Sequence, residues 1–155
     1  MTSQMIGLIA VATLAVGGAG VRTPSAQSVT YVAHMTGATE TPPNQTTGTG
    51  TATFTLSGTK LSYVITVDGI TGQATAAHIH VGKVGVAGPP VYTFTLKQVG
   101  AKGTLASGDI DLTKEVSKGV SGDSLKTLLR TGAAYVNVHT AAHAGGEIRG
   151  QIEKK

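Results

Sequence analysis

Apolar or small side chains alternate with polar ones along most of the chain after Ser28. In residues 50–56 a small or apolar residue occupies every second position, and threonines fill the positions between them. Residues 61–67 repeat the pattern after a polar turn, so the two segments together predict a β-hairpin. A period of two sends alternate side chains to opposite faces of a strand, whereas one face of a helix needs a period of 3.6. The chain is therefore expected to consist mainly of half-buried strands.

Further short segments of the same kind follow, separated by turns rich in glycine and proline. They cover residues 29–35, 76–81, 92–96, 110–112, 134–138 and 148–152. One segment differs, because Leu125, Leu128 and Leu129 have the i, i+3, i+4 spacing of a helix face. Ser121 or Asp123 can cap its start and Gly132 its end. At this length we predict one all-β domain, an immunoglobulin-like or superoxide dismutase-like sandwich or a barrel of about 7–9 short strands with a short helix near residues 123–131.

Composition excludes several classes of protein. The 155 residues include no cysteine, which removes disulfides, thiolate metal sites and catalytic thiols. Aromatic residues make up only 4% of the chain, too few for a platform on which nucleic-acid bases stack. The formal charge is +4 and the basic residues are scattered, so no nucleic-acid partner is expected.

The N-terminal segment predicts export. Residues 5–16 are apolar and are continued weakly by residues 17–21. Ala26-Gln27-Ser28 has the small-x-small form of a cleavage site. We therefore predict a signal peptide over residues 1–28 and a mature domain over residues 29–155, located in the periplasm or secreted. No stable membrane insertion is expected after cleavage, although an uncleaved anchor is the alternative.

Three of the five histidines are predicted to share one site. His78 and His80 flank Ile79 on one strand, so both face away from it, about 6.6 Å apart at Cα. His139 likewise lies opposite Val138 on a later strand. If the two strands are neighbours, three imidazoles can reach one ion with bonds of about 2.0–2.1 Å.

His143 lies four residues after His139 in a turn with glycine and is a possible fourth ligand. His34 has no histidine partner in sequence and is expected to be structural or exposed. The alternative for His78, His80 and His139 is that they bind no metal and are surface residues or hydrogen-bonded structural residues. An all-imidazole site without a paired carboxylate suits copper first and zinc second, rather than magnesium or calcium.

Four stretches resemble the chordin-domain (CHRD) family. They are TGATETPP (36–43), AHIHVG (77–82), AYVNVHT (134–140) and GGEIRGQI (145–152), in the order that the family has them. The resemblance covers roughly residues 29–152 and implies a compact β-domain of exported proteins. Its His-x-His and Val-His-Thr motifs correspond to His78, His80 and His139. The sequence departs from the family in residues 82–90, where Gly-Lys-Val-Gly replaces the usual Gly-Pro-Ala step.

A looser similarity links the chain to Cu/Zn superoxide dismutase. That sandwich also has a His-x-His on one strand and a Val-His followed by a glycine-rich turn, which favours copper. Dismutase activity is not implied, because the chain lacks the disulfide and the zinc-loop ligands. Glu40 and Arg149 lie in family motifs, and we expect an ion pair or backbone hydrogen bonds from them.

The sequence thus predicts an exported CHRD protein that binds copper or zinc for storage or delivery rather than for turnover. Two other functions stay open. One is a metal-free adhesion module that binds a protein partner, and the other is a dismutase-like redox enzyme.

Overall fold

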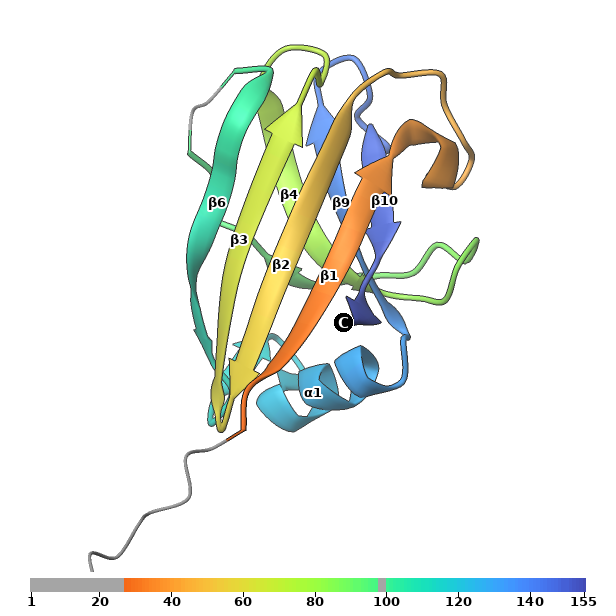
Figure 1. Ribbon diagram of the computed structural model, residues 1–155. Helices are drawn as coiled ribbons and strands as arrows, with labels where there is room; N and C mark the ends of the chain where they lie inside the picture. Colours follow the sequence, from red (N-terminus) through yellow and green to blue (C-terminus); the bar gives the residue numbers. More distant parts are fainter. Residues whose placement is uncertain (1–26, 98–99) are drawn as a thin grey trace, which may run out of the picture.

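The computed structural model describes residues 27–97 and 100–155, and it is built mainly from β-strands (Figure 1). The expected signal peptide falls almost wholly outside the described residues. Within them lie one 3-10 turn, η1 (Gly37–Thr39), and one α-helix, α1 (Gly122–Arg130). The strands are β1 (Val29–Thr36), β2 (Thr49–Ser57), β3 (Lys60–Asp68), β4 (Ala74–Val81), β5 (Pro90–Thr93), β6 (Lys102–Asp111), β7 (Glu115–Ser117), β8 (Val120–Ser121), β9 (Ala134–Thr140), β10 (Ile148–Gln151) and β11 (Glu153–Lys154).

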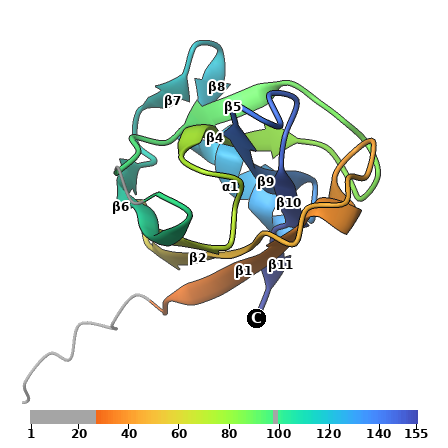
Figure 2. The ribbon, with the colours of Figure 1, turned by 90° about the horizontal axis from the view of Figure 1, so that it is seen from above.

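Nine of these strands form one antiparallel sheet. Its order is β5-β4-β9-β10-β1-β2-β3-β6, and β11 pairs with β1 beside β10. The sheet curls so that its two ends face each other across the core, as the view from above shows (Figure 2). Phe94, next to β5, contacts Tyr63 of β3 with ring centroids 4.9 Å apart. The all-β prediction is confirmed. The two facing halves of the structure belong to one sheet, which runs from one half to the other through β10 and β1.

The expected hairpin is β2 and β3, and its register follows the sequence pattern. Ala52 pairs with Ile65 and Phe54 with Tyr63, and all four side chains are buried on the inner face. Gly58, with φ of 59°, makes the tight turn between the strands. The threonines between these positions face outward, where β-branched polar side chains suit the solvent side of a sheet.

Helix α1 closes one end of the curled sheet (Figure 1). Ser121 caps its start by accepting a hydrogen bond from the backbone N–H of Ser124 at 3.1 Å. Leu125 and Leu129 are buried against the core, and Gly132 follows the helix with φ of 63°. The predicted helix is therefore confirmed. In the part of the chain that the structure describes, no helix has the length and hydropathy to span a membrane.

Strands β4 and β9 are neighbours and share one inner face. Ile79, Val136 and Val138 are fully buried there. Since successive side chains of a strand point to opposite faces, the residues between them lie on the outer face of the sheet.

Candidate metal centre

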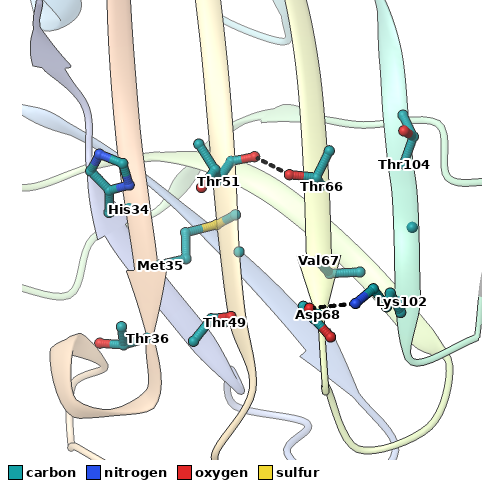
Figure 3. Close-up of a pocket in the computed structure, with 12 residues that line it drawn as sticks. His34, Met35, Thr36, Thr49, Thr51, Thr66, Val67, Asp68, Lys102 and Thr104 are labelled. Carbon is teal, nitrogen blue, oxygen red and sulfur yellow. Dashed lines mark hydrogen bonds and ion pairs between the residues drawn. The ribbon is translucent and has the colours of Figure 1, made fainter.

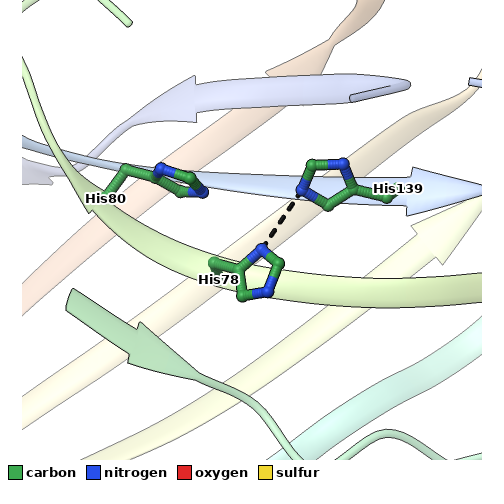
Figure 4. Close-up of side chains that lie close together, drawn as sticks. All are labelled: His78, His80 and His139. Atoms are coloured by element: carbon green, nitrogen blue, oxygen red, sulfur yellow. Dashed lines mark hydrogen bonds between the residues drawn. The ribbon is translucent and has the colours of Figure 1, made fainter. Parts of the chain in front are cut away.

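His78, His80 and His139 lie together on the outer face of β4 and β9 (Figure 4). In the antiparallel register His78 pairs with Asn137 and His80 with Tyr135, so His139 lies diagonally across from His78. One ring nitrogen from each histidine lies within 4.8 Å of the corresponding nitrogens of the other two. The geometry that the strand pattern predicts is therefore present, and binding of a metal there remains a prediction.

Backbone carbonyls fix the tautomers of two of these rings. The Nδ1 atom of His80 lies 2.7 Å from the carbonyl oxygen of Gly88, and the Nδ1 atom of His139 lies 3.0 Å from that of Ala144. A carbonyl oxygen can only accept, so in each pair the ring Nδ1–H donates. In the neutral ring the proton is then at Nδ1, and Nε2 carries a free lone pair. Hydrogen bonds of this kind are what orient histidine ligands in known metal sites.

The spacing of the nitrogens fits a small ion. His78 Nδ1 lies 3.2 Å from His139 Nε2. Two ligand atoms bound tetrahedrally at about 2.0–2.1 Å would lie about 3.3 Å apart. His80, the third histidine of the group, lies on the same strand as His78, and the centroids of these two rings are 5.4 Å apart. Burial, with the positive charges that His139 and His80 can carry, lowers the pKa of His78.

The surroundings of His80 also favour a neutral ring. Burial is the main cause that lowers its pKa, and the charges of His139 and Arg149 act in the same direction. The hydrogen bond to the Gly88 carbonyl and the nearby Asn137 side chain oppose this shift of the pKa without reversing it. The lowered pKa of His80 thus favours the neutral imidazole, the form that binds metal ions.

The two remaining histidines lie apart from this group. His143 belongs to the turn after β9, where its backbone N–H donates to the Thr140 carbonyl at 3.1 Å. Within the described residues, the group of side chains that could hold an ion does not include His143. His34 is exposed on β1, two strands away from β9, in a groove lined by residues of β1, β2, β3 and β6, five of them threonines (Figure 3).

A column of stacked side chains supports the centre from one side. The ring of Tyr135 stacks on that of His80, with centroids 4.9 Å apart and an angle of 11° between the planes. The guanidinium of Arg149 lies 3.4 Å from the centroid of Tyr135. Sequence reasoning did not assign Tyr135 to the site, although the alternation in β9 places it on the same face as His139.

Arg149 also fastens the loop between β4 and β5 to the sheet. Its Nη2 atom donates to the carbonyl oxygens of Lys83 at 3.0 Å and Val86 at 2.9 Å, and its Nη1 atom donates to Thr41 at 3.1 Å. The backbone hydrogen bonds expected from Arg149 are therefore present. The same loop carries the Gly88 carbonyl that orients His80, so Arg149 acts on the centre through the loop.

Glu40 is buried near Arg149 without a direct ion pair. The ion pairs within 4.0 Å in the described part of the chain do not include one between them, so the alternative of an ion pair is not realised. Burial raises the pKa of Glu40, while the Thr41 N–H, the Arg149 charge and the nearby Asn137 amide partly oppose the rise. Oxygen Oε1 of Glu40 is buried and has no hydrogen-bond partner among the described residues.

A second buried carboxylate, Glu147, was not singled out from the sequence. Its Oε1 accepts hydrogen bonds from the Thr46 hydroxyl and from the N–H and hydroxyl of Thr71, and its Oε2 accepts from the Thr140 hydroxyl at 2.6 Å. Burial alone would raise the pKa of Glu147, but these donors hold it below its ordinary value. Glu147 therefore joins two loops to the end of β9, just beyond His139.

Comparison with protein families assigns the chain. The family model of the CHRD domain matches residues 31–152. The chain belongs to the CHRD family. CHRD domains are an extracellular type of module, and the three clustered histidines all lie inside the matched residues of this CHRD domain. Comparison with curated proteins and with solved structures found no match. The likeness to Cu/Zn superoxide dismutase stays a prediction from the sequence.

Proposed function

We propose that this CHRD protein binds one divalent transition-metal ion, copper or zinc, through His78, His80 and His139, for storage or delivery outside the cytoplasm. The observation that carries the proposal is the convergence of three imidazoles of which two are fixed by backbone carbonyls. Copper is the first choice because it has the highest affinity for nitrogen ligands in the general order of divalent ions, and zinc is the second.

Metal uptake by the full chain tests this proposal. Wild-type protein is titrated with Cu(II) and with Zn(II) in a calorimeter, and the bound metal is counted after removal of excess ions. Substitution of alanine for His78, His80 or His139 should abolish stoichiometric uptake, since each removes one ligand of three. His34→Ala is the matched control, because His34 is exposed on the same sheet away from the group. His143→Ala shows whether the turn after β9 supplies a further ligand.

The result that would contradict the proposal is equally clear. If wild-type protein takes up neither ion, the metal-free adhesion module is the better hypothesis. If the three variants bind as wild type does, the histidines are structural and the ion is held elsewhere. A superoxide assay on copper-loaded protein separates binding from turnover, and no catalysis above that of the free ion is expected.

The proposal includes export with cleavage after Ser28. It is supported by the apolar N-terminal segment and by the extracellular character of CHRD domains. N-terminal sequencing of protein from the periplasm or the culture medium should give Val29 as the first residue. Full-length protein in the cytosol would contradict it.

A further inference from the structure

Atoms that can only accept hydrogen bonds converge at the centre of the histidine group. His80 and His139 donate through Nδ1 to carbonyl oxygens, so their Nε2 atoms carry lone pairs, and that of His139 lies 3.2 Å from His78 Nδ1. The Nε2 atom of His80 is buried and has no hydrogen-bond partner among the described residues. A buried acceptor without a donor costs about 1–3 kcal/mol. A cation at this point would satisfy these lone pairs together.

The side chain of Asn137 brings one more acceptor to the same point. Asn137 lies on β9 between Val136 and Val138 and is only 4% exposed, on the face that carries the histidines. Its Oδ1 atom lies 3.1 Å from His139 Nε2. The side chain also lies beside His80 and is paired across the strands with His78. Asn137 therefore contacts or neighbours every member of the group.

The separations match those of ligands around one ion. His139 Nε2 lies 3.1 Å from Asn137 Oδ1 and 3.2 Å from His78 Nδ1. Ligand atoms in a tetrahedral site with bonds of about 2.0–2.1 Å are about 3.3 Å apart. An amide oxygen and two imidazole nitrogens are thus already near the spacing that a shared ion requires.

Glu40 gives the amide its orientation. The Asn137 amide lies near the Glu40 carboxylate and helps to lower its pKa, and a negative neighbour favours the NH₂ group on that side and Oδ1 on the side of the histidines. Gly146 leaves the room that the carboxylate needs, since a Cβ atom at Gly146 would collide with Glu40 Oε1. Glu40 is therefore a positioning residue. Its negative charge also partly neutralises the positive charge of a bound ion.

We propose that the Asn137 side-chain oxygen is the fourth metal ligand, held in place by Glu40, and that this oxygen makes the site select divalent ions over Cu(I). The inference rests on the proposed function, because it concerns the same site. Amide oxygen is a hard ligand that suits divalent ions, whereas Cu(I) prefers soft ligands. The geometry accordingly favours Cu(II) or Zn(II) as the cargo.

The affinities of Asn137→Ala protein for Zn(II), Cu(II) and Cu(I) test the inference. We expect Zn(II) and Cu(II) affinity to fall by at least about 10–100-fold, the range seen when only an outer-shell partner of a metal ligand is removed. Cu(I) affinity should stay unchanged, so the Cu(II)/Cu(I) potential should rise by about 59 mV for each tenfold loss. The Cu(II) EPR spectrum should change as the oxygen ligand is lost. Asn137→Asp keeps an oxygen donor and should retain divalent binding.

Two further variants test whether the effect on metal binding is specific to Asn137 and what Glu40 contributes to it. Asn44→Ala removes the chain's other asparagine, whose amide donates to the carbonyl oxygens of Gly146 and Glu147, and it should lower stability without changing metal affinity. Glu40→Gln should weaken Cu(II) binding by less than Asn137→Ala does, because the amide keeps a neutral acceptor.

The outcomes distinguish this inference from the proposed function. If wild-type protein binds no ion, both are overturned. If wild-type protein binds metal and Asn137→Ala changes neither the divalent affinity nor the EPR spectrum, the fourth ligand alone is overturned. If Asn137→Ala does not fold, Asn137→Asp decides, and loss of divalent binding by that folded variant overturns the assignment. Unchanged Cu(II) affinity in Glu40→Gln removes Glu40 from the site.

Discussion

Substitution of Glu147 by glutamine tests how far one buried carboxylate holds the loops around the histidine group. The carboxylate is fully buried and accepts hydrogen bonds from the hydroxyls of Thr46, Thr71 and Thr140 and from the N–H of Thr71. Glutamine has nearly the same shape. It keeps an oxygen for the donors around Oε1, and the Thr140 hydroxyl must turn to accept from the new NH₂ group.

The expected cost follows from the number of hydrogen bonds. A bond to a charged group contributes about 1.5–3 kcal/mol and a neutral bond about 0.5–1.5 kcal/mol, so each of the four loses about 1 kcal/mol. Removal of a buried charge returns part of this loss. We therefore expect Glu147→Gln to lower the free energy of unfolding at pH 7 by about 2–3 kcal/mol.

Urea denaturation of metal-free protein between pH 7 and pH 3 measures the effect and its cause. The donors hold the pKa of Glu147 below its ordinary value of 4.5, although burial alone would raise it. Its contribution is thus fully present above about pH 4.5 and is lost as the pH falls through the lowered pKa. The free energies of unfolding of wild type and Glu147→Gln should therefore converge in acid.

The exposed Glu153→Gln is the control, and its free energy of unfolding should stay within about 0.5 kcal/mol of that of wild type. A variant as stable as wild type at pH 7, or a gap that does not narrow in acid, would refute this reasoning.

Three further predictions concern the surroundings of the site. Because the pKa values of His78 and His80 are lowered by burial, Zn(II) binding followed by calorimetry should persist to lower pH than a site of ordinary histidines allows, and half-loss at or above pH 6.5 would contradict this. Arg149→Gln should lower the free energy of unfolding by about 1.5–3 kcal/mol in urea, the contribution of a hydrogen bond from a charged group, and a wild-type curve would show that its hydrogen bonds are dispensable. Gly146→Ala, at φ of 130°, should cost about 1–3 kcal/mol in the same assay, while Gly145→Ala, which meets no atom within 4 Å, should cost less.

The sequence was most informative where one face of a strand is apolar. The hairpin of β2 and β3, strand β9 and helix α1 all have a clear period, and the structure places them where the pattern predicts. Strand β6 was underestimated, because only its last residues were expected to be a strand and the structure extends it over Lys102–Asp111. Gly103 and Gly108 interrupt its alternation, and the register with β3 shifts after Ile65. Strands β7 and β8 were missed since they have only three and two residues.

The candidate site was predictable in part. Alternation placed His78, His80 and His139 on outer faces, and only the pairing of β4 with β9 had to be assumed. The same alternation puts Asn137 on that face, so it could have been found from sequence. Glu40 could not, because it follows η1 and is brought to β9 by a loop whose path no periodicity encodes.

The division of β4 and β9 into two faces has a consequence for how this domain can vary. Ile79, Val136 and Val138 fill the interior, and the histidines stand on the opposite side of the same strands. Exchange of a histidine therefore opens no void among the packed side chains. The outer face of these two strands, with any ion binding that its side chains provide, can therefore change in sequence while the packed core stays the same.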